Sequence, residues 1–191
     1  NVENPVDMYI DLVKKDTEQG DLFSTRFTVY KGDKCIFSAG TVDDRVEITE
    51  HEVSEGEYEY YITEAYSGSP WYENILKDRF IKLYVKVRGN GVVQILNDES
   101  NISPGYFEIY EGSYRDLSSA KLISRDDEVY SYVHAIEVEK NADGISVIKV
   151  TVENPTKYEF RLKKKNAANT TLYGSKSVSY THLRAHETDS Y

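Results

Sequence analysis

Residues 81–88 read Ile-Lys-Leu-Tyr-Val-Lys-Val-Arg, and this stretch decides the fold class. Apolar side chains stand at every second position, with lysine, tyrosine or arginine between them. Because successive side chains of a strand point to opposite faces, the pattern predicts a strand with one face in a core. The alternation recurs along the chain, at Met8-Ile10-Leu12, Phe27 with Val29, Val46 with Ile48, Ile136 with Val138, and Ile148-Val150-Val152.

Turn-forming residues separate these short stretches, at positions 31–33, 54–56, 89–91, 103–105 and 141–144. Several contain Asn-Gly or Asp-Gly or a similar pair, which favours hairpins because glycine and asparagine tolerate a positive φ. No stretch has the period of an amphipathic helix. We therefore expect an all-β protein, an antiparallel immunoglobulin-like sandwich.

Composition excludes several classes of function. The chain has 191 residues and a formal net charge of −10, which argues against nucleic-acid binding because phosphate recognition needs a basic surface. The sequence contains no run of 18 apolar residues, so it predicts no membrane-spanning helix. Cys35 is the only cysteine, so no internal disulfide can form. His51 and His134 lie far apart, and no phosphate loop, nucleophile elbow or zinc spacing occurs, so we expect no enzyme activity, no cofactor and no metal.

An internal repeat sets the expected domain boundaries. Val-Glu-Asn-Pro occurs at residues 2–5 and again at 152–155, and an apolar-x-Leu-x-Lys-Lys pattern follows at the same offset. We expect residues 1–5 to end a preceding repeat, 6–154 to form one full repeat with an extra section at about 98–130, and 155–177 to begin the next. The tail, 178–191, resembles translated sequencing-adapter read-through.

Parity identifies three candidate site residues. Ile10 and Leu12 share the core face of the first strand, and Lys14 lies on the same parity. The same argument puts Asn154 on the core face of the last strand, and Glu64 on that of a middle strand. A buried lysine tends to lose its proton and a buried carboxyl tends to keep one. A neutral Lys14 amine is a nucleophile, and an acid can polarise the Asn154 carboxamide, so the three could form an amide and release ammonia.

The same segments resemble a known family. Residues 10–30, with Lys14 followed by a glycine-containing turn and then Phe-Thr-Val-Tyr, look like the opening of collagen-adhesin B-type and pilin prealbumin-like domains. Residues 61–64, 70–72 and 150–154 resemble their Tyr-x-x-x-Glu strand, their Pro-x-Tyr loop and their last strand. The resemblance implies stalks attached to the cell wall, and an intramolecular Lys–Asn isopeptide bond promoted by the glutamate. Lys14, Glu64 and Asn154 are the matching positions.

The chain also departs from the family pattern. Ser24-Thr25-Arg26 replaces the family's Gly-Ala before the second-strand phenylalanine, and the unit is longer than usual. Residues 93–97 form a second apolar strand that ends in asparagine. Asn97 is therefore an alternative acceptor, with residues 98–154 as a separate small module in that case.

We expect an extracellular protein, cell-wall attached, whose partners are neighbouring repeats of the same chain. A ligand-binding module is the alternative, recognising a glycan or a host protein through Tyr61, Tyr66, Trp71 and Tyr72. Packing of the same aromatic rings in the core and across strands is the simpler interpretation.

Overall fold

The computed structural model describes residues 6–16, 25–41, 45–65, 75–125 and 133–154. The described residues form strands and their connections, with no helix long and apolar enough to cross a membrane. The strands are β1 (Val6–Asp16), β2 (Arg26–Lys31), β3 (Lys34–Gly40), β4 (Arg45–Val53), β5 (Gly56–Ala65), β6 (Arg79–Val87), β7 (Val93–Leu96), β8 (Glu108–Glu111), β9 (Lys121–Arg125), β10 (Val133–Lys140) and β11 (Ser146–Asn154).

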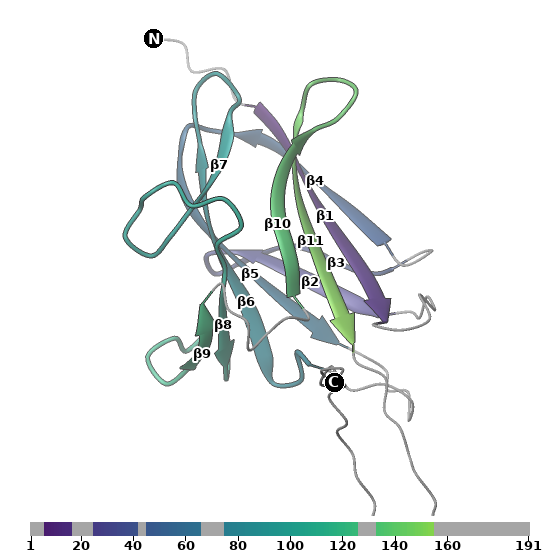
Figure 1. Cartoon of the computed structure of the whole chain (residues 1–191), viewed down its shortest axis with the longest axis vertical. Helices are drawn as coiled ribbons and strands as arrows, with labels where there is room; N and C mark the ends of the chain where they lie inside the picture. The colour runs from purple at the N-terminus through teal and green to yellow at the C-terminus, as the bar shows by residue number, and fades with distance from the viewer. Residues whose placement is uncertain (1–5, 17–24, 42–44, 66–74, 126–132, 155–191) are drawn as a thin grey trace, which may run out of the picture.

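Two sheets pack face to face, which confirms the expected all-β sandwich (Figure 1). A four-stranded sheet has the order β10-β11-β1-β4. A seven-stranded sheet has the order β3-β2-β5-β6-β8-β9, with β7 also paired to β6. The predicted turns at 31–33, 54–56, 89–91 and 141–144 join consecutive strands.

The core lies between the sheets and follows the predicted alternation. Met8, Ile10 and Leu12 of β1 and Ile148, Val150 and Val152 of β11 are all fully buried, as are Ile81, Leu83 and Val85 of β6. Burying one such side chain stabilises a fold by about 1.5–3 kcal/mol, so these faces supply most of the driving force. The polar residues between them point to the outer faces.

One strand pair departs from the expected antiparallel arrangement. The strands β1 and β11 are parallel neighbours, with Lys14 beside Val152 and Asp16 beside Asn154. All other pairings of the described strands are antiparallel. Figure 1 shows β1 and β11 running side by side in the same direction. Parallel pairing brings the carboxyl ends of both strands to one end of the sandwich, whereas an antiparallel pair would separate them.

The described part of the section at about 98–130 is built into the sandwich. Within 98–130, β8 pairs with residues 79–82 of β6, and β9 pairs with β8. Residues 98–154 therefore do not form a separate module, because β8 extends one sheet and β11 lies at the centre of the other.

A buried carboxylate ties this added section to the rest of the sheet. Glu108 of β8 is 1% exposed and accepts hydrogen bonds from Tyr84 (3.1 Å), Tyr106 (2.8 Å), Tyr110 (2.9 Å) and the Arg125 Nε (3.2 Å). Burial raises the pKa of Glu108, but the hydrogen bonds outweigh burial and hold the pKa below its usual 4.5. Burial and the bond to Glu108 raise the pKa of Tyr110 to about 12.

We expect Glu108→Gln to lower the free energy of unfolding by about 1–2 kcal/mol at neutral pH, since the amide replaces a charged acceptor by a neutral one. A carboxyl with a lowered folded-state pKa stabilises the fold above its unfolded pKa, and loses that contribution as the pH falls through the folded value. The difference from wild type should therefore shrink below pH 4.5. Urea unfolding at several pH values measures it.

Glu111→Gln is the matched control, because Glu111 lies on the same strand and is exposed. Equal unfolding free energies for wild type and Glu108→Gln at neutral pH would show that the charge of Glu108 adds nothing to the stability of the fold.

Candidate functional site

The three residues selected by parity are all buried. Lys14 and Asn154 are 0% exposed, and Glu64 is 8% exposed with its side chain fully covered. Lys14 continues the core face of β1, and Asn154 ends the core face of β11. A lysine amine and a carboxamide thus stand where apolar residues would cost less.

The strand geometry brings Lys14 and Asn154 to the same region. Since Lys14 lies beside Val152 in the parallel register, Asn154 is displaced from it by two residues on the same face of the neighbouring strand. Both residues lie near the carboxyl ends of their strands, and Figure 1 shows these two strand ends at the same end of the sandwich.

Glu64 reaches Lys14 from the opposite sheet. It is the penultimate residue of β5, and its Oε1 lies 2.6 Å from Nζ of Lys14. The ion pair therefore joins the two sheets through the core. Burial lowers the pKa of Lys14, and the negative charge and hydrogen bond of Glu64 raise it only in part, so the net direction is down.

Thr25 is a fourth polar residue of this cluster, 4% exposed. Its hydroxyl donates to Oε1 of Glu64 at 2.8 Å. Parity could have found it, because Thr25 precedes the core residues Phe27 and Val29 at the same spacing. Sequence reasoning treated it only as a departure from the family pattern.

Three side-chain atoms of Asn154 and Glu64 have no hydrogen-bond partner within the part of the chain that the structure describes. Both Nδ2 and Oδ1 of Asn154 are buried without a hydrogen bond, and so is Oε2 of Glu64. A buried polar group left unpaired costs about 1–3 kcal/mol. A carboxamide in this state is desolvated, and a reaction that releases Nδ2 as ammonia would remove its two unpaired N–H donors, while the carbonyl oxygen would remain in the product amide.

The alternative acceptor, Asn97, has a different environment. It is half-buried and follows β7, in the opposite sheet from Lys14. Its side-chain oxygen accepts from the backbone N–H groups of Glu99 (3.0 Å) and Asn101 (3.0 Å). Asn97 therefore acts as the cap of a tight turn.

The aromatic residues considered for ligand binding divide into two groups. Tyr61 is 3% exposed, and its hydroxyl donates to Glu59 while its ring packs against Phe80 and Tyr114. It therefore offers no free face to a ligand, contrary to the alternative expectation. Tyr66, Trp71 and Tyr72 lie outside the described residues.

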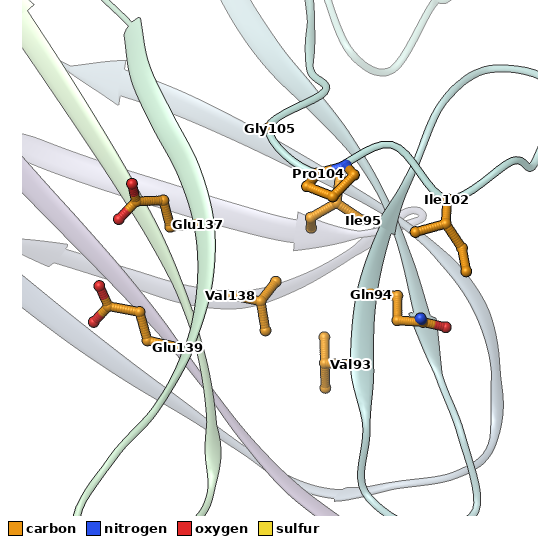
Figure 2. Close-up of a pocket in the computed structure, with 9 residues that line it drawn as sticks. All are labelled: Val93, Gln94, Ile95, Ile102, Pro104, Gly105, Glu137, Val138 and Glu139. Atoms are coloured by element: carbon orange, nitrogen blue, oxygen red, sulfur yellow. The ribbon is translucent and has the colours of Figure 1, made fainter.

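A groove of about 620 Å³ lies between β7 and β10 (Figure 2). Val93, Ile95 and Val138 line it, together with the exposed Ile102, and no aromatic side chain of a described residue does. In Figure 2 the carboxylates of the neighbouring glutamates point away from Val138. The groove is thus aliphatic, unlike the aromatic platforms that stack sugar rings.

Fold and site together define a class: an all-β sandwich domain that holds a buried amine, carboxyl and carboxamide at one end. Comparison with known proteins adds little to this. No protein-family model matches the chain, and no curated protein matches it. The crystal structure of the pilus adhesin SpaC from Lactobacillus rhamnosus GG is similar over 92% of this chain, at 12% identity and a TM-score of 0.41. The chain spans 21% of that adhesin.

Proposed function

We propose that residues 6–154 form a structural stalk domain of a bacterial surface adhesin or pilin-like protein, closed by an isopeptide bond between Lys14 and Asn154. One observation carries the proposal: the buried Lys14–Glu64 pair, at 2.6 Å, lies at the end of the sandwich where β11 finishes in a fully buried carboxamide with no hydrogen-bond partner among the described residues. A buried ion pair seldom stabilises more than apolar residues of the same size, so its presence favours a chemical role.

The reaction begins with a proton transfer inside the pair. Because burial lowers the pKa of Lys14, the ammonium can pass a proton to Glu64 across the short contact. The products are a neutral amine, which is a nucleophile, and a neutral carboxylic acid, which can donate a hydrogen bond to the Asn154 carbonyl oxygen.

The bond changes then balance without a cofactor. Nζ of Lys14 attacks Cγ of Asn154, the new N–C bond forms, and the bond from Cγ to Nδ2 breaks. Glu64 passes its proton to the departing nitrogen, which leaves as ammonia, and takes up the proton that the new amide nitrogen sheds. Glu64 ends as the neutral acid, and the buried charges have disappeared.

The crosslink suits a domain that bears tension. It would join β1 to β11 near their carboxyl ends, so force entering at Val6 would run along β1, cross the bond and leave through Asn154. The remaining strands would be bypassed. Together with the repeated Val-Glu-Asn-Pro segment, this supports an extracellular, cell-wall-attached array whose partners are neighbouring repeats. A glycan or host-protein ligand has no specific observation in its favour, since Tyr61 is buried.

Mass spectrometry of acceptor variants tests the proposal. We expect Asn97→Ala to lose one ammonia, about 17 Da, beyond the mass change of the substitution, as the wild type does. Asn154→Ala should keep its full calculated mass, because no carboxamide is left to react. The opposite pattern, with the loss abolished only in Asn97→Ala, would move the bond to Asn97 and overturn this assignment.

A further inference from the structure

Thr25 contacts the proposed acid directly but takes no part in bond making. Its hydroxyl lies 2.8 Å from Oε1 of Glu64 and 3.5 Å from the carbonyl oxygen of Ala65. We propose that Thr25 is a positioning residue that holds Glu64 in place through both of its protonation states; this rests on the crosslinking function proposed above.

The backbone around Thr25 is fixed by a second threonine. The Thr25 N–H donates to Oγ1 of Thr41 at 3.2 Å, and the Thr41 N–H donates to the Thr25 carbonyl at 2.8 Å. These two residues flank the paired ends of β2 and β3, where Arg26 lies beside Gly40. The Thr25 hydroxyl is therefore carried by a backbone segment that two hydrogen bonds hold in place. It cannot move away from Glu64 unless those hydrogen bonds break.

A hydroxyl suits an acid that changes state, because it can both donate and accept. While Glu64 is a carboxylate, Thr25 donates to Oε1. While the proton taken from Lys14 rests on Oε1, Thr25 can accept from it and turn its own hydrogen toward the Ala65 carbonyl. When the acid donates to Asn154 instead, Thr25 donates to Oε1 again. Thr25 gains and loses no proton overall.

The same contact assigns different tasks to the two oxygens of Glu64. Oε1 faces both Lys14, at 2.6 Å, and Thr25. Oε2 is buried and has no hydrogen-bond partner among the described residues. Thr25 thus holds the carboxyl plane so that Oε2 remains free for the carboxamide. The chain departs here from the Gly-Ala pattern of the family it resembles, and alanine could not make this contact.

The rate of crosslinking tests this. Full-length chain recovered unfolded from inclusion bodies is refolded, and ammonia loss is followed by intact mass. We expect Thr25→Val, which keeps the size but removes the hydroxyl, to slow the reaction about tenfold, the effect of one lost hydrogen bond. Thr25→Ser should stay within about twofold of wild type, because it restores the donor and acceptor. A purely packing role predicts the reverse order, since valine fills the space better than serine.

Thr28→Val is the control. It makes the same substitution three residues further along, in β2, where the hydroxyl contacts Ser38 and not Glu64. Circular dichroism gives the folded fraction, and rates are expressed per folded molecule. If Thr25→Val does not fold, Thr25→Ala replaces it and the comparison with Thr25→Ser is the same. If the variant without a hydroxyl crosslinks at the wild-type rate, the positioning role of Thr25 is overturned but the proposed crosslinking function is not. Absence of ammonia loss in the wild type would instead overturn the proposed function.

Discussion

Pulled from its two ends, the Lys14→Met variant is expected to lengthen by about 450–500 Å more than the wild type when the domain unfolds. This is the contour length of residues 14–154, which an amide between Lys14 and Asn154 would hold out of the force path. In the wild type only β1 up to Lys14 and the segments outside the domain can extend. Single-molecule force spectroscopy on the full chain measures the step.

Lys15→Met provides the control for that experiment. Lys15 is the exposed neighbour of Lys14 on the same strand, so the substitution changes one charge without touching the buried cluster. Its extension should equal that of the wild type. An unfolding step of about 450–500 Å in the wild type itself would mean that no covalent bond bypasses the core.

The second large effect is on thermal stability. We expect Lys14→Met and Glu64→Gln each to lower the melting temperature by about 10–20 °C. Closing a loop from residue 14 to 154 restricts the unfolded chain, and the loop-entropy relation gives about 5 kcal/mol for a crosslink of this span. The two variants would fail to form the proposed bond for different reasons, one lacking the nucleophile and the other the proton carrier, so we expect their melting temperatures to fall together.

Calorimetry measures the melting temperatures of these variants. Lys15→Met, measured beside them, shows the effect of losing one exposed charge. Removal of one partner of a buried ion pair leaves the other charge uncompensated and costs about 3–5 kcal/mol by itself, so Asn154→Ala, which keeps the pair and lacks only the carboxamide, isolates the contribution of the crosslink. A melting temperature for Glu64→Gln equal to that of the wild type would argue that no crosslink contributes to stability.

The fold class followed from the sequence because alternation is a local signal. The face carrying Ile81 and Leu83 could be predicted without knowing what covers it, and both side chains are fully buried. The order and direction of the strands could not be predicted in this way. Parallel pairing of β1 with β11 depends on how the whole chain is threaded, and it departs from the antiparallel expectation.

The residues of the candidate site could also be predicted from the local alternation of side chains. Parity placed Lys14, Glu64 and Asn154 on core faces, and all three are buried. Their residue types did not reveal that Glu64 reaches Lys14 from the other sheet, because that contact depends on sandwich packing. Thr25 was missed since a threonine at the start of a strand is an ordinary strand residue.

The abundance of tyrosine was harder to interpret from sequence. The sequence left a ligand-binding role for Tyr61 open, yet the hydroxyls of Tyr60 and Tyr61 donate to the carboxylates of Glu50 and Glu59. A tyrosine in a strand can bury its ring and satisfy its hydroxyl with an acidic neighbour. For Tyr60 and Tyr61 the acidic neighbours therefore serve packing and hydrogen bonding within the fold.

Tandem mass spectrometry of the folded, purified chain after proteolysis tests the central claim most directly. The account predicts one branched peptide in which Lys14 and Asn154 are joined, lighter than the sum of its two parts by one ammonia, about 17 Da, and absent from Glu64→Gln. Recovery of the two peptides as separate species, each with its full calculated mass, would contradict it.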